Sequence, residues 1–310
     1  MGKPERVLVT GGSGFIGSHF VDKLVSEGYN VRVLDNLSSG HLENLSDHLK
    51  AEKVDFVKGD IRDSAVVYKC LENVDAVVHF AAQISVTFSV DHPDFTFDVN
   101  ACGTKNLLNA SAKKTVGKFV LASSCAVYGD PDPESLPLKE TSETNPISPY
   151  AESKLQAENY CLQSDKQDLL QSVVLRFFNV YGVRQGLNDY SGVITRFIGR
   201  IKEKKPLIIY GDGSQSRDFV NVKDIVNAVF AAMQNADAHS QVFNIGSGKP
   251  TSIDELAKTL LELADVDLEI CYEKPRAGDI KHSYGNITKA RKVLGYEPKV
   301  SLKDGLLKLL

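Results

Sequence analysis

The sequence has no tryptophan, two methionines and five cysteines. It also lacks long apolar runs, and none approaches the ~20 residues that a membrane-spanning helix needs. The opening residues Met1–Glu5 lack the apolar core of a secretory signal. We therefore expect neither a membrane span nor a signal peptide, and a cytoplasmic protein.

The sequence also has no large excess of positive or negative charge. The chain has 36 Lys and Arg residues against 40 Asp and Glu residues, for a formal net charge of −4. This balance is too mild to indicate a nucleic-acid or membrane partner. The cysteines are scattered, without a CxxC spacing or a nearby histidine pair, so we expect reduced thiols and no metal site.

The 310 residues are enough for about two domains, and the first of them opens with a glycine-rich turn. A β-branched run, Arg6–Thr10, leads through Gly11, Gly14 and Gly17 into an apolar pattern with helical spacing. Gly11 allows the tight turn, Gly14 lets the backbone approach a pyrophosphate, and Gly17 lets the helix pack closely on the strand. The pattern predicts the first βα unit of a dinucleotide-binding fold.

An acid follows the second predicted strand. Asn30–Leu34 ends in Asp35, roughly the ~20 residues downstream at which a carboxylate meets the adenosine ribose. Asp35 would repel a ribose 2′-phosphate, and no arginine follows it before Arg62, so NAD is favoured over NADP. The alternative is a solvated acid at the end of a strand.

Four more apolar runs predict strands of a doubly wound parallel sheet, at residues 54–58, 75–79, 118–122 and 172–178. After the third strand, an exposed Asp60 could accept from an adenine amino group while Ile61 covers the ring. We interpret His79, at the end of the fourth strand, as a core histidine. Asn100, in the long helix that follows, either braces the site or is a buried structural amide.

The strongest signal of catalytic chemistry lies after the fifth strand. That strand leads into Ser123 and Ser124, at the sheet edge where open α/β sheets bind ligands. Tyr150 and Lys154 are four residues apart, on one face of a helix that starts after Ser148. The spacing is common by chance, but here it follows a nucleotide-binding half and a serine-rich strand end.

The pattern changes character after residue 178. A loop, a helix and a short strand, Leu207–Tyr210, are followed by Arg217 at a loop exit. A helix at 223–234 and a strand at 241–245 are expected to rejoin the main sheet. We therefore predict an NAD-binding Rossmann domain at 1–178, rejoined by about 217–245, and a smaller α+β substrate domain at 179–310.

Together these motifs resemble the extended short-chain dehydrogenase/reductase family along nearly the whole chain, and within it the branch that epimerises UDP-hexoses at C4. The resemblance implies an NAD-dependent isomerase acting on UDP-glucose and UDP-galactose, and also on UDP-GlcNAc and UDP-GalNAc. The stretches that carry it are Gly11–Gly17, Asp35–Asn36, Asp60–Ile61, His79–Ala82, Ser123–Gly129, Tyr150–Lys154, Arg176–Gly182, Arg217–Val222 and Arg276–Asp279.

The resemblance also implies a mechanism. Tyr150 is the catalytic base for the sugar O4 proton, and Ser124 hydrogen-bonds O4 and the tyrosine oxygen. The C4 hydride passes to NAD, and the resulting 4-keto sugar turns over and takes it back on its other face. Tyrosine titrates near ~10, so a base poised near neutrality needs its pKa lowered by about three units. Lys154 and the positively charged nicotinamide are the expected sources.

The resemblance assigns two sets of binding residues. The cofactor set is Gly11, Gly14, Phe15, Ile16, Gly17, Asp35, Asn36, Ser39, Gly40, Asp60, Ile61, Phe80, Ala81, Ala82, Asn100, Tyr150, Lys154 and Phe177. The substrate set is Ser124, Tyr150, Asn179, Gly192, Val193, Tyr210, Arg217, Arg276, Asp279 and Ser283.

Within the substrate set, Tyr210 is expected beside the uracil, Asp279 on the uridine ribose, and Arg217 and Arg276 on the diphosphate. Each arginine taken singly could instead form a surface ion pair. The residue resembling the family's sugar-pocket gate is the small Ser283, so N-acetylated hexoses are expected to fit.

Several alternatives stay open. Family dehydratases carry an Asp-Glu pair where this chain has Cys125 and Ala126, which argues against a dehydratase. A UDP-glucuronate 4-epimerase remains a rival because of Arg184 and Ser123. A non-catalytic NAD-sensing protein and a hydride-releasing dehydrogenase are the others. By analogy with the family, we expect a homodimer formed through the helices after Pro93 and Tyr150.

Overall fold

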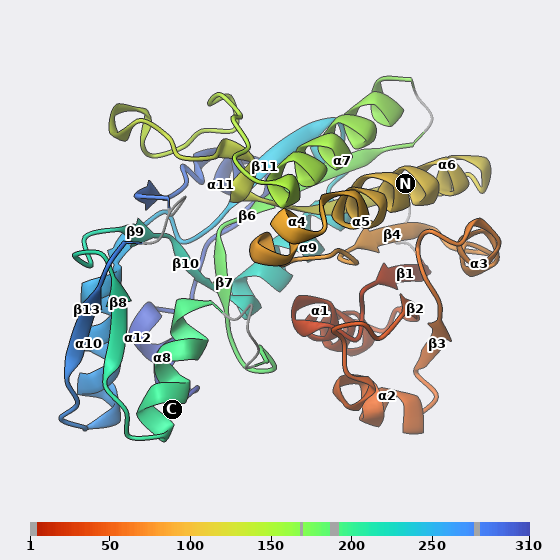
Figure 1. The fold of residues 1–310 in the computed structure, drawn as a ribbon. Helices are drawn as coiled ribbons and strands as arrows, with labels where there is room; N and C mark the ends of the chain where they lie inside the picture. Colours follow the sequence, from red (N-terminus) through yellow and green to blue (C-terminus); the bar gives the residue numbers. More distant parts are fainter. Residues whose placement is uncertain (1–4, 168–169, 187–191, 276–279) are drawn as a thin grey trace.

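A seven-stranded parallel sheet lies at the centre of the computed structural model, which describes residues 5–167, 170–186, 192–275 and 280–310 (Figure 1). The strand order is β3-β2-β1-β4-β5-β6-β11, and every pair of neighbours is parallel. This is the doubly wound order of dinucleotide-binding folds, extended by one strand. Its strands are β1 (Arg6–Thr10), β2 (Asn30–Asp35), β3 (Val54–Lys58), β4 (Ala76–His79), β5 (Lys118–Ser124), β6 (Ser172–Phe177) and β11 (Gln241–Ile245).

The predicted strands of this sheet are confirmed. The main difference is that β5 extends to Ser124, two residues past the expected end, because Ser123 and Ser124 pair in register with Arg176 and Phe177 of β6. The strand β11 pairs with β6, so the segment after residue 240 does rejoin the sheet.

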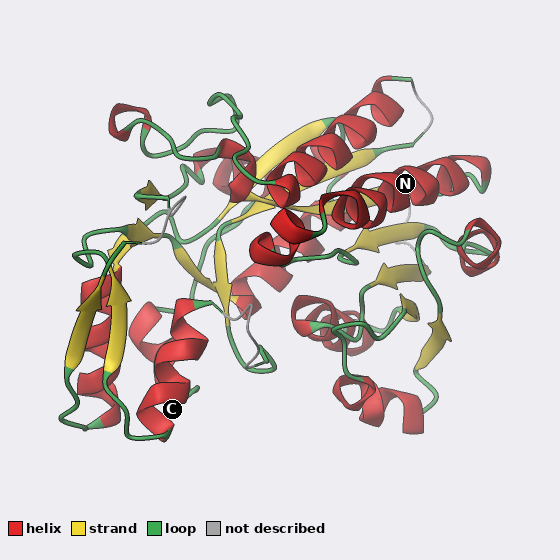
Figure 2. Ribbon diagram, in the orientation of Figure 1, coloured by secondary structure: helices red, strands yellow, loops and turns green. Residues whose placement is uncertain are grey.

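Helices cover both faces of the sheet, and each face has its own apolar core (Figure 2). One core is built on α1, α9 and α11, and the other on α3, α6 and α7. All four residues of β4 are buried, as expected for a strand covered on both sides. The helices are α1 (Phe15–Ser26), α2 (Ser46–Lys50), α3 (Ser64–Cys70), α4 (Val86–Asp91), α5 (Pro93–Phe97), α6 (Gly103–Lys113), α7 (Pro149–Lys166), α8 (Val193–Lys202), α9 (Val222–Gln234), α10 (Ile253–Ala264), α11 (Thr288–Leu294) and α12 (Leu302–Leu307).

The long helix expected around Asn100 is not regular. A π-helical segment, Asp98–Cys102, lies between α5 and α6. Such segments insert an extra residue into a helical turn and are frequent at functional sites. Among the helices of the described residues, none combines the length and apolar character of a membrane span.

A second lobe packs beside the sheet and has a separate core of α8, α10, α12 and a two-stranded sheet (Figure 1). The chain crosses to it along β7 (Asn179–Tyr181), which pairs in parallel with β10 (Phe219–Asn221). The predicted strand at 207–210 is confirmed, whereas its partner runs from Ile270 to Glu273 rather than from 268 to 272. The remaining strands are β8 (Leu207–Tyr210), β9 (Ser216–Arg217), β12 (Thr251–Ser252), β13 (Ile270–Glu273) and β14 (His282–Ser283).

A buried carboxylate joins the short segments of this lobe. Asp218 has no exposed surface and directly follows the two-residue strand β9. Its oxygens accept from the Ser247 backbone N–H and hydroxyl, both at 2.6 Å, from the Gly248 N–H at 3.0 Å and from the Gly285 N–H at 3.3 Å. The carboxylate thereby satisfies donors that such short strands leave unpaired.

Candidate active site

The glycine turn between β1 and α1 has the shape that a pyrophosphate requires. Gly11 has a φ of +68°, and an added Cβ there would lie 2.7 Å from the Ala81 nitrogen. At Gly17 an added Cβ would lie 2.1 Å from the Gly11 carbonyl oxygen. At Gly14 it would approach only that same oxygen, at 3.2 Å, so the space beyond this glycine is open. The adjacent Ser13 hydroxyl is buried and has no partner among the described residues.

Asp35 closes the next strand as a buried, oriented carboxylate. Its oxygens accept from the Ser13 N–H at 2.9 Å and the Leu37 N–H at 2.8 Å. Each oxygen keeps further lone-pair capacity for a ribose hydroxyl. Gly40 leaves no room for a side chain here, because an added Cβ would lie 3.1 Å from the Asp35 Oδ2.

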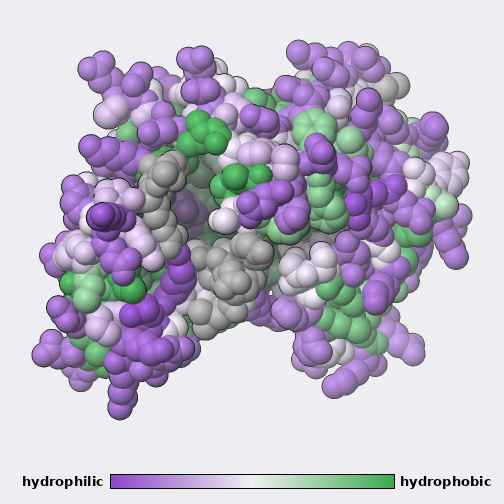
Figure 3. Space-filling model, viewed as in Figure 1, coloured by the Kyte–Doolittle hydropathy of each residue, from purple (hydrophilic) through white to green (hydrophobic). Residues whose placement is uncertain are grey.

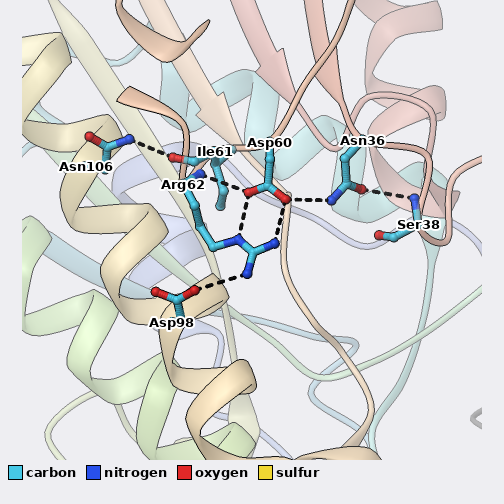
Figure 4. Close-up of polar contacts among 7 residues, drawn as sticks. All are labelled: Asn36, Ser38, Asp60, Ile61, Arg62, Asp98 and Asn106. Carbon is cyan, nitrogen blue, oxygen red and sulfur yellow. Dashed lines mark hydrogen bonds and ion pairs between the residues drawn. The ribbon is translucent and has the colours of Figure 1, made fainter. Parts of the chain in front are cut away.

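Asp60 lies in a network that the sequence did not predict (Figure 4). Arg62 donates to both of its carboxylate oxygens, each at 2.9 Å, and Asn36 donates to Oδ2 at 3.0 Å. The guanidinium also reaches Asp98 on the π-helical segment, at 3.0 Å. These contacts hold the pKa of Asp60 well below its usual range. Asp60 is half-buried rather than exposed, and Ile61 is 4% exposed.

His79 is a core histidine, as predicted. Its Nδ1 lies 2.6 Å from the Thr10 hydroxyl and its Nε2 lies 2.9 Å from the Thr104 hydroxyl. Since Thr104 donates to the Asn100 carbonyl, its oxygen accepts from Nε2, and the neutral ring carries its proton there. Burial lowers the pKa of His79 to about 3, so the ring stays neutral at physiological pH.

Asn100 connects two elements of the site. It is 1% exposed, and its side chain accepts from the Gln83 N–H at 2.8 Å and donates to the Gln83 carbonyl at 2.9 Å. Its second amide hydrogen goes to the Ser153 hydroxyl, at 3.0 Å. Both hydrogens are therefore used within the protein, which favours the bracing interpretation: Asn100 ties the loop after β4 to the residue before Lys154.

Tyr150, Lys154 and Ser124 come together at the carboxyl end of β5. Ser148 caps α7 by accepting from the Ala151 N–H at 3.2 Å, which sets the helix register. The Ser124 side chain lies close enough to the Tyr150 hydroxyl to act on its pKa. The Lys154 ammonium donates to the Ala122 carbonyl at 2.6 Å, two residues before Ser124.

The pKa values of this pair differ from the expectation. Burial raises the pKa of Tyr150 to about 12, against the opposing effect of the nearby Ser124 side chain. Burial also lowers the pKa of Lys154 to about 8. The expected lowering of the Tyr150 pKa by Lys154 is wrong for the protein alone, because the hydroxyl is desolvated and the ammonium is directed to Ala122.

The other residues expected to bind the cofactor follow the carboxyl ends of their strands, at one edge of the sheet. Those already described are Asp35, Asp60 and the glycines. The rest are Phe15 and Ile16 in the first turn of α1, Asn36, Ser39 and Gly40 after β2, Phe80, Ala81 and Ala82 after β4, and Phe177 at the end of β6.

The residues expected to bind substrate lie at the junction with the second lobe. Asn179 begins β7, and its Oδ1 is buried without a partner among the described residues. Gly192 precedes α8 and Val193 opens it, while Tyr210 ends β8. Arg276 and Asp279 lie outside the described residues.

Two strands bring Arg217 next to Ser283, in register across β9 and β14. Arg217 donates to the Ser216 carbonyl at 2.9 Å. Ser283 is 5% exposed and lies close enough to the Cys125 thiol to act on its pKa. Burial raises the pKa of Cys125 to about 11, so this thiol is neutral at physiological pH. The expected sugar gate therefore contacts the residue that follows Ser124.

The residues that suggested a glucuronate substrate have protein partners. The Ser123 hydroxyl donates to Glu158 in the interior. Arg184 pairs with Asp22 of α1 at 2.8 Å and donates to Ser18 at 3.2 Å. Ser123 is therefore committed to a protein partner, whereas Arg184 uses Nη1 alone in these contacts.

The sequence analysis missed a buried ion pair behind the site. Glu158 of α7 and Arg176 of β6 are 1% and 5% exposed, and Nη2 lies 2.7 Å from Oε2. The available signal was the spacing, because Glu158 follows Lys154 by four residues and therefore shares its helix face. Within the described ranges, no His, Cys, Asp and Glu side chains form a group that could hold a metal ion.

The surface is hollowed between the sheet half and the second lobe, beside the residues drawn in grey (Figure 3). Residues proposed for the cofactor come from the sheet edge on one side, and those proposed for the substrate come from the lobe on the other. Tyr150, the expected base, belongs to α7 of the sheet half.

Comparison with known proteins gives consistent matches over the full chain. Residues 7–246 match the family described as "NAD dependent epimerase/dehydratase family". The chain is 40% identical over 306 residues to a putative UDP-glucose 4-epimerase of Methanocaldococcus jannaschii, covering 98% of this chain and 97% of that one.

Solved structures give the same result. A Thermotoga maritima UDP-glucose 4-epimerase with UDP-glucose superposes with a TM-score of 0.93 at 40% identity, over 98% of this chain and 97% of that one. A UDP-N-acetylglucosamine 4-epimerase of Methanobrevibacter ruminantium in complex with UDP-N-acetylmuramic acid superposes with a TM-score of 0.93 at 36% identity. The match covers 99% of this chain and 97% of that one.

Proposed function

The chain belongs to the NAD-dependent epimerase/dehydratase family, and from that premise we propose that it catalyses the 4-epimerisation of a UDP-hexose. The proposed substrates are UDP-glucose and UDP-galactose, together with UDP-GlcNAc and UDP-GalNAc. The observation that carries the proposal is the placement of Tyr150 beside Ser124 at the end of β5, next to the buried ammonium of Lys154. The structural relatives with UDP-sugars in their names support the same substrate class.

The cofactor is NAD, and the residues at the sheet edge fit it. The open space beyond Gly14 and the buried, unpartnered Ser13 hydroxyl suit a pyrophosphate at the amino end of α1. Asp35 is oriented by two backbone donors and would accept from the adenosine ribose. NAD, when bound, supplies the hydride acceptor and donor for the sugar C4.

Tyr150 would hold and move the proton of the sugar O4 hydroxyl. Ser124 would orient O4 through the hydroxyl that already contacts Tyr150. With a pKa of about 12, the phenol is protonated at neutral pH in the protein alone. Its use as a base therefore depends on positive charge in the site, and Lys154, whose pKa is about 8, is mostly an ammonium at pH 7.

The second lobe would hold the nucleotide. Asn179 has an unpartnered buried oxygen, and Arg217 carries a guanidinium suited to a diphosphate. We propose the roles that the family resemblance implies for the other residues of this set. Tyr210 lies beside the uracil, and the Gly192–Val193 backbone holds the UDP. Arg276 binds the diphosphate, and Asp279 binds the uridine ribose. Ser283 leaves a small side chain beside Cys125, which favours acceptance of an N-acetyl group.

The test is proton NMR of the purified protein with UDP-glucose, UDP-GlcNAc and UDP-glucuronate in turn, without added cofactor. We expect axial C4 products from UDP-glucose and UDP-GlcNAc, and loss of turnover on the order of 100-fold or more in Tyr150→Phe. Turnover of UDP-glucuronate alone would favour the rival epimerase. Undiminished turnover in Tyr150→Phe would contradict the proposed base, and stoichiometric consumption of added NAD would indicate a dehydrogenase.

We also propose a homodimer formed through α4, α5 and α7. Large apolar side chains are exposed on α4 and α5: Val90 is 63% exposed, Val86 49%, Phe95 46% and Phe97 41%. Such a group of exposed apolar side chains is typical of an interface. Light scattering is expected to give twice the chain mass, and Val90→Asp is expected to give monomers. A monomeric wild-type protein at micromolar concentration would contradict this assembly.

A further inference from the structure

Three polar side chains of α7 are spaced one turn apart on its buried face. Tyr150 contacts Ser124, the Lys154 ammonium donates to the Ala122 carbonyl at 2.6 Å, and Glu158 accepts from the Ser123 hydroxyl. Ala122, Ser123 and Ser124 are consecutive in β5. The strand end that presents Ser124 is therefore fastened to α7 at each of its last three residues.

Glu158 is the most heavily bonded of these side chains. Besides the Ser123 hydroxyl, it accepts from Arg176 Nε at 3.0 Å and from Arg176 Nη2 at 2.7 Å. The Arg176 guanidinium also lies over the Tyr128 ring, 4.7 Å from its centroid. A buried ion pair loses much of its Coulomb energy to desolvation, so stability alone gives little reason for it.

The surroundings of Lys154 give a functional reason for a negative charge at Glu158. On its own helix, Lys154 faces Glu158 and Cys161. From the sheet, it faces His79 of β4 and the Ala122 carbonyl of β5. Arg176 of β6 lies on the far side of Glu158. His79 is neutral, and burial raises the pKa of Cys161, so this thiol is neutral too. Among the groups that act on Lys154, Glu158 therefore carries the negative charge, and it opposes the effect of burial on the ammonium.

We propose that Glu158 is a positioning residue of the epimerisation: it keeps Lys154 charged beside Tyr150 and holds the end of β5 so that Ser124 faces the tyrosine hydroxyl. This inference rests on the proposed function, since it acts through the residues that would handle the proton. Glu158 itself contacts neither substrate nor cofactor in this scheme.

The experiment is the pH dependence of kcat for Glu158→Gln with UDP-glucose between pH 6 and 10. Activity requires the ammonium, so it falls as pH rises through the Lys154 pKa of about 8. Removing a neighbouring opposite charge is expected to move this fall to lower pH by about one unit, with kcat at pH 8 reduced roughly fivefold and KM little changed. Glu158→Asp keeps the charge on a shorter side chain, so kcat drops while the pH of the fall stays at its wild-type value.

Asp165→Asn is the matched control. Asp165 is also buried on α7, two turns further on, and accepts from the Ser172 and Ser240 N–H groups. Its loss is expected to lower stability without moving the pH of the fall. If Glu158→Gln does not fold because Arg176 is left unpaired, the double variant Glu158→Gln/Arg176→Gln removes that cation. It is also expected to show the fall in activity at lower pH.

The outcomes separate the two proposals. The inference is supported if kcat falls at a lower pH in Glu158→Gln or in the double variant, and at the wild-type pH in Asp165→Asn and Glu158→Asp. A fall at the wild-type pH in the variants that lack the charge, with thermal melts that show folded protein, would overturn it. A wild-type protein inactive on every UDP-hexose would overturn the proposed function instead.

Discussion

The two halves of this molecule are held together in different ways. The sheet half is a continuous parallel ladder in which β5 alone contributes seven residues and β4 is buried on both faces. In the second lobe, β9, β12 and β14 have two residues each, and the buried carboxylate of Asp218 binds the backbone donors around them. Ladder hydrogen bonds are spread over many residues, whereas four hydrogen bonds around these short strands converge on the Asp218 side chain. A single substitution should therefore affect the two halves very differently.

The largest effect is expected at glycines whose neighbours cannot move aside for a side chain. In Gly17→Ala the new Cβ would lie 2.1 Å from the Gly11 carbonyl, which is backbone of the cofactor turn. Overpacking costs about 1–3 kcal/mol where neighbours can shift, and this backbone has little freedom, so NAD binding should be lost. Gly305→Ala places its Cβ 2.1 Å from the Tyr181 hydroxyl, in the core of the lobe, so it should lower stability and retain NAD binding. Calorimetric titration with NAD checks both, and NAD binding by Gly17→Ala would contradict the first.

A second substitution tests whether one carboxylate holds the lobe. Asp218→Asn keeps the shape but turns an amide NH₂ toward backbone donors, so the free energy of unfolding should fall by about 3 kcal/mol. The affinity for UDP should fall with it, while NAD binding is retained. Asp212→Asn, at an exposed position of the same lobe, is the control and should change stability by less than about 0.5 kcal/mol. Equal stability of the two variants in urea denaturation would contradict this role.

The sheet half carries a pH dependence of its own. The pKa of His79 is lowered from 6.5 to about 3, so below pH 6.5 the unfolded chain binds a proton that the folded chain does not. Stability should therefore fall with decreasing pH, by up to about 1.4 kcal/mol per unit from this group. His79→Gln should be less stable at pH 7 but show a smaller loss between pH 6 and 5. Parallel urea midpoints for the two proteins over that range would count against a neutral buried ring.

The smallest effect is expected at the adenosine end of the site. Arg62 is partly exposed and pairs with Asp60 and Asp98, so its replacement by Ala should cost up to about 1 kcal/mol. The pKa of Asp60 should rise toward its usual value, and NAD affinity should fall by up to about fivefold. Lys205→Ala removes the exposed Lys205–Glu203 pair of the lobe and should leave NAD affinity unchanged. A change of equal size in both variants would contradict a specific role for Arg62.

The sequence predicts much of the sheet half because its signals are local. Each strand is an apolar run bounded by polar turns, and the helix starts carry side chains that cap the chain beside them, as Asp63 does for α3 and Ser148 for α7. The lobe is harder to predict because a two-residue strand has no period to detect. The π-helical segment around Asn100 also differs from the prediction, since the extra residue in that turn is not visible in the spacing of apolar residues.

The residues of the site also divide into those that the sequence predicts and those that it does not. The glycine turn, Asp35, and the Tyr150 and Lys154 pair follow from spacing along the chain, and the structure brings the pair to Ser124. Glu158 and Arg176 were not identified. The four-residue spacing places Glu158 on the helix face of Lys154, but a buried charged residue and a solvated one look alike in a sequence. The pKa of Tyr150 was expected to be low and is raised, since burial of its hydroxyl depends on packing that the sequence does not display.

The path of the chain between the two cores limits how the protein can be divided. After β6 the described chain enters the lobe, returns to the sheet with α9 and β11, enters the lobe again with α10, packs α11 on the sheet core and ends with α12 in the lobe core. Every continuous fragment that contains one complete core therefore also carries part of the other. A premature stop codon between β11 and α11 would remove parts of both cores, and one after Tyr296 would remove only α12 from the lobe core. Neither half can therefore be produced alone by truncating the chain.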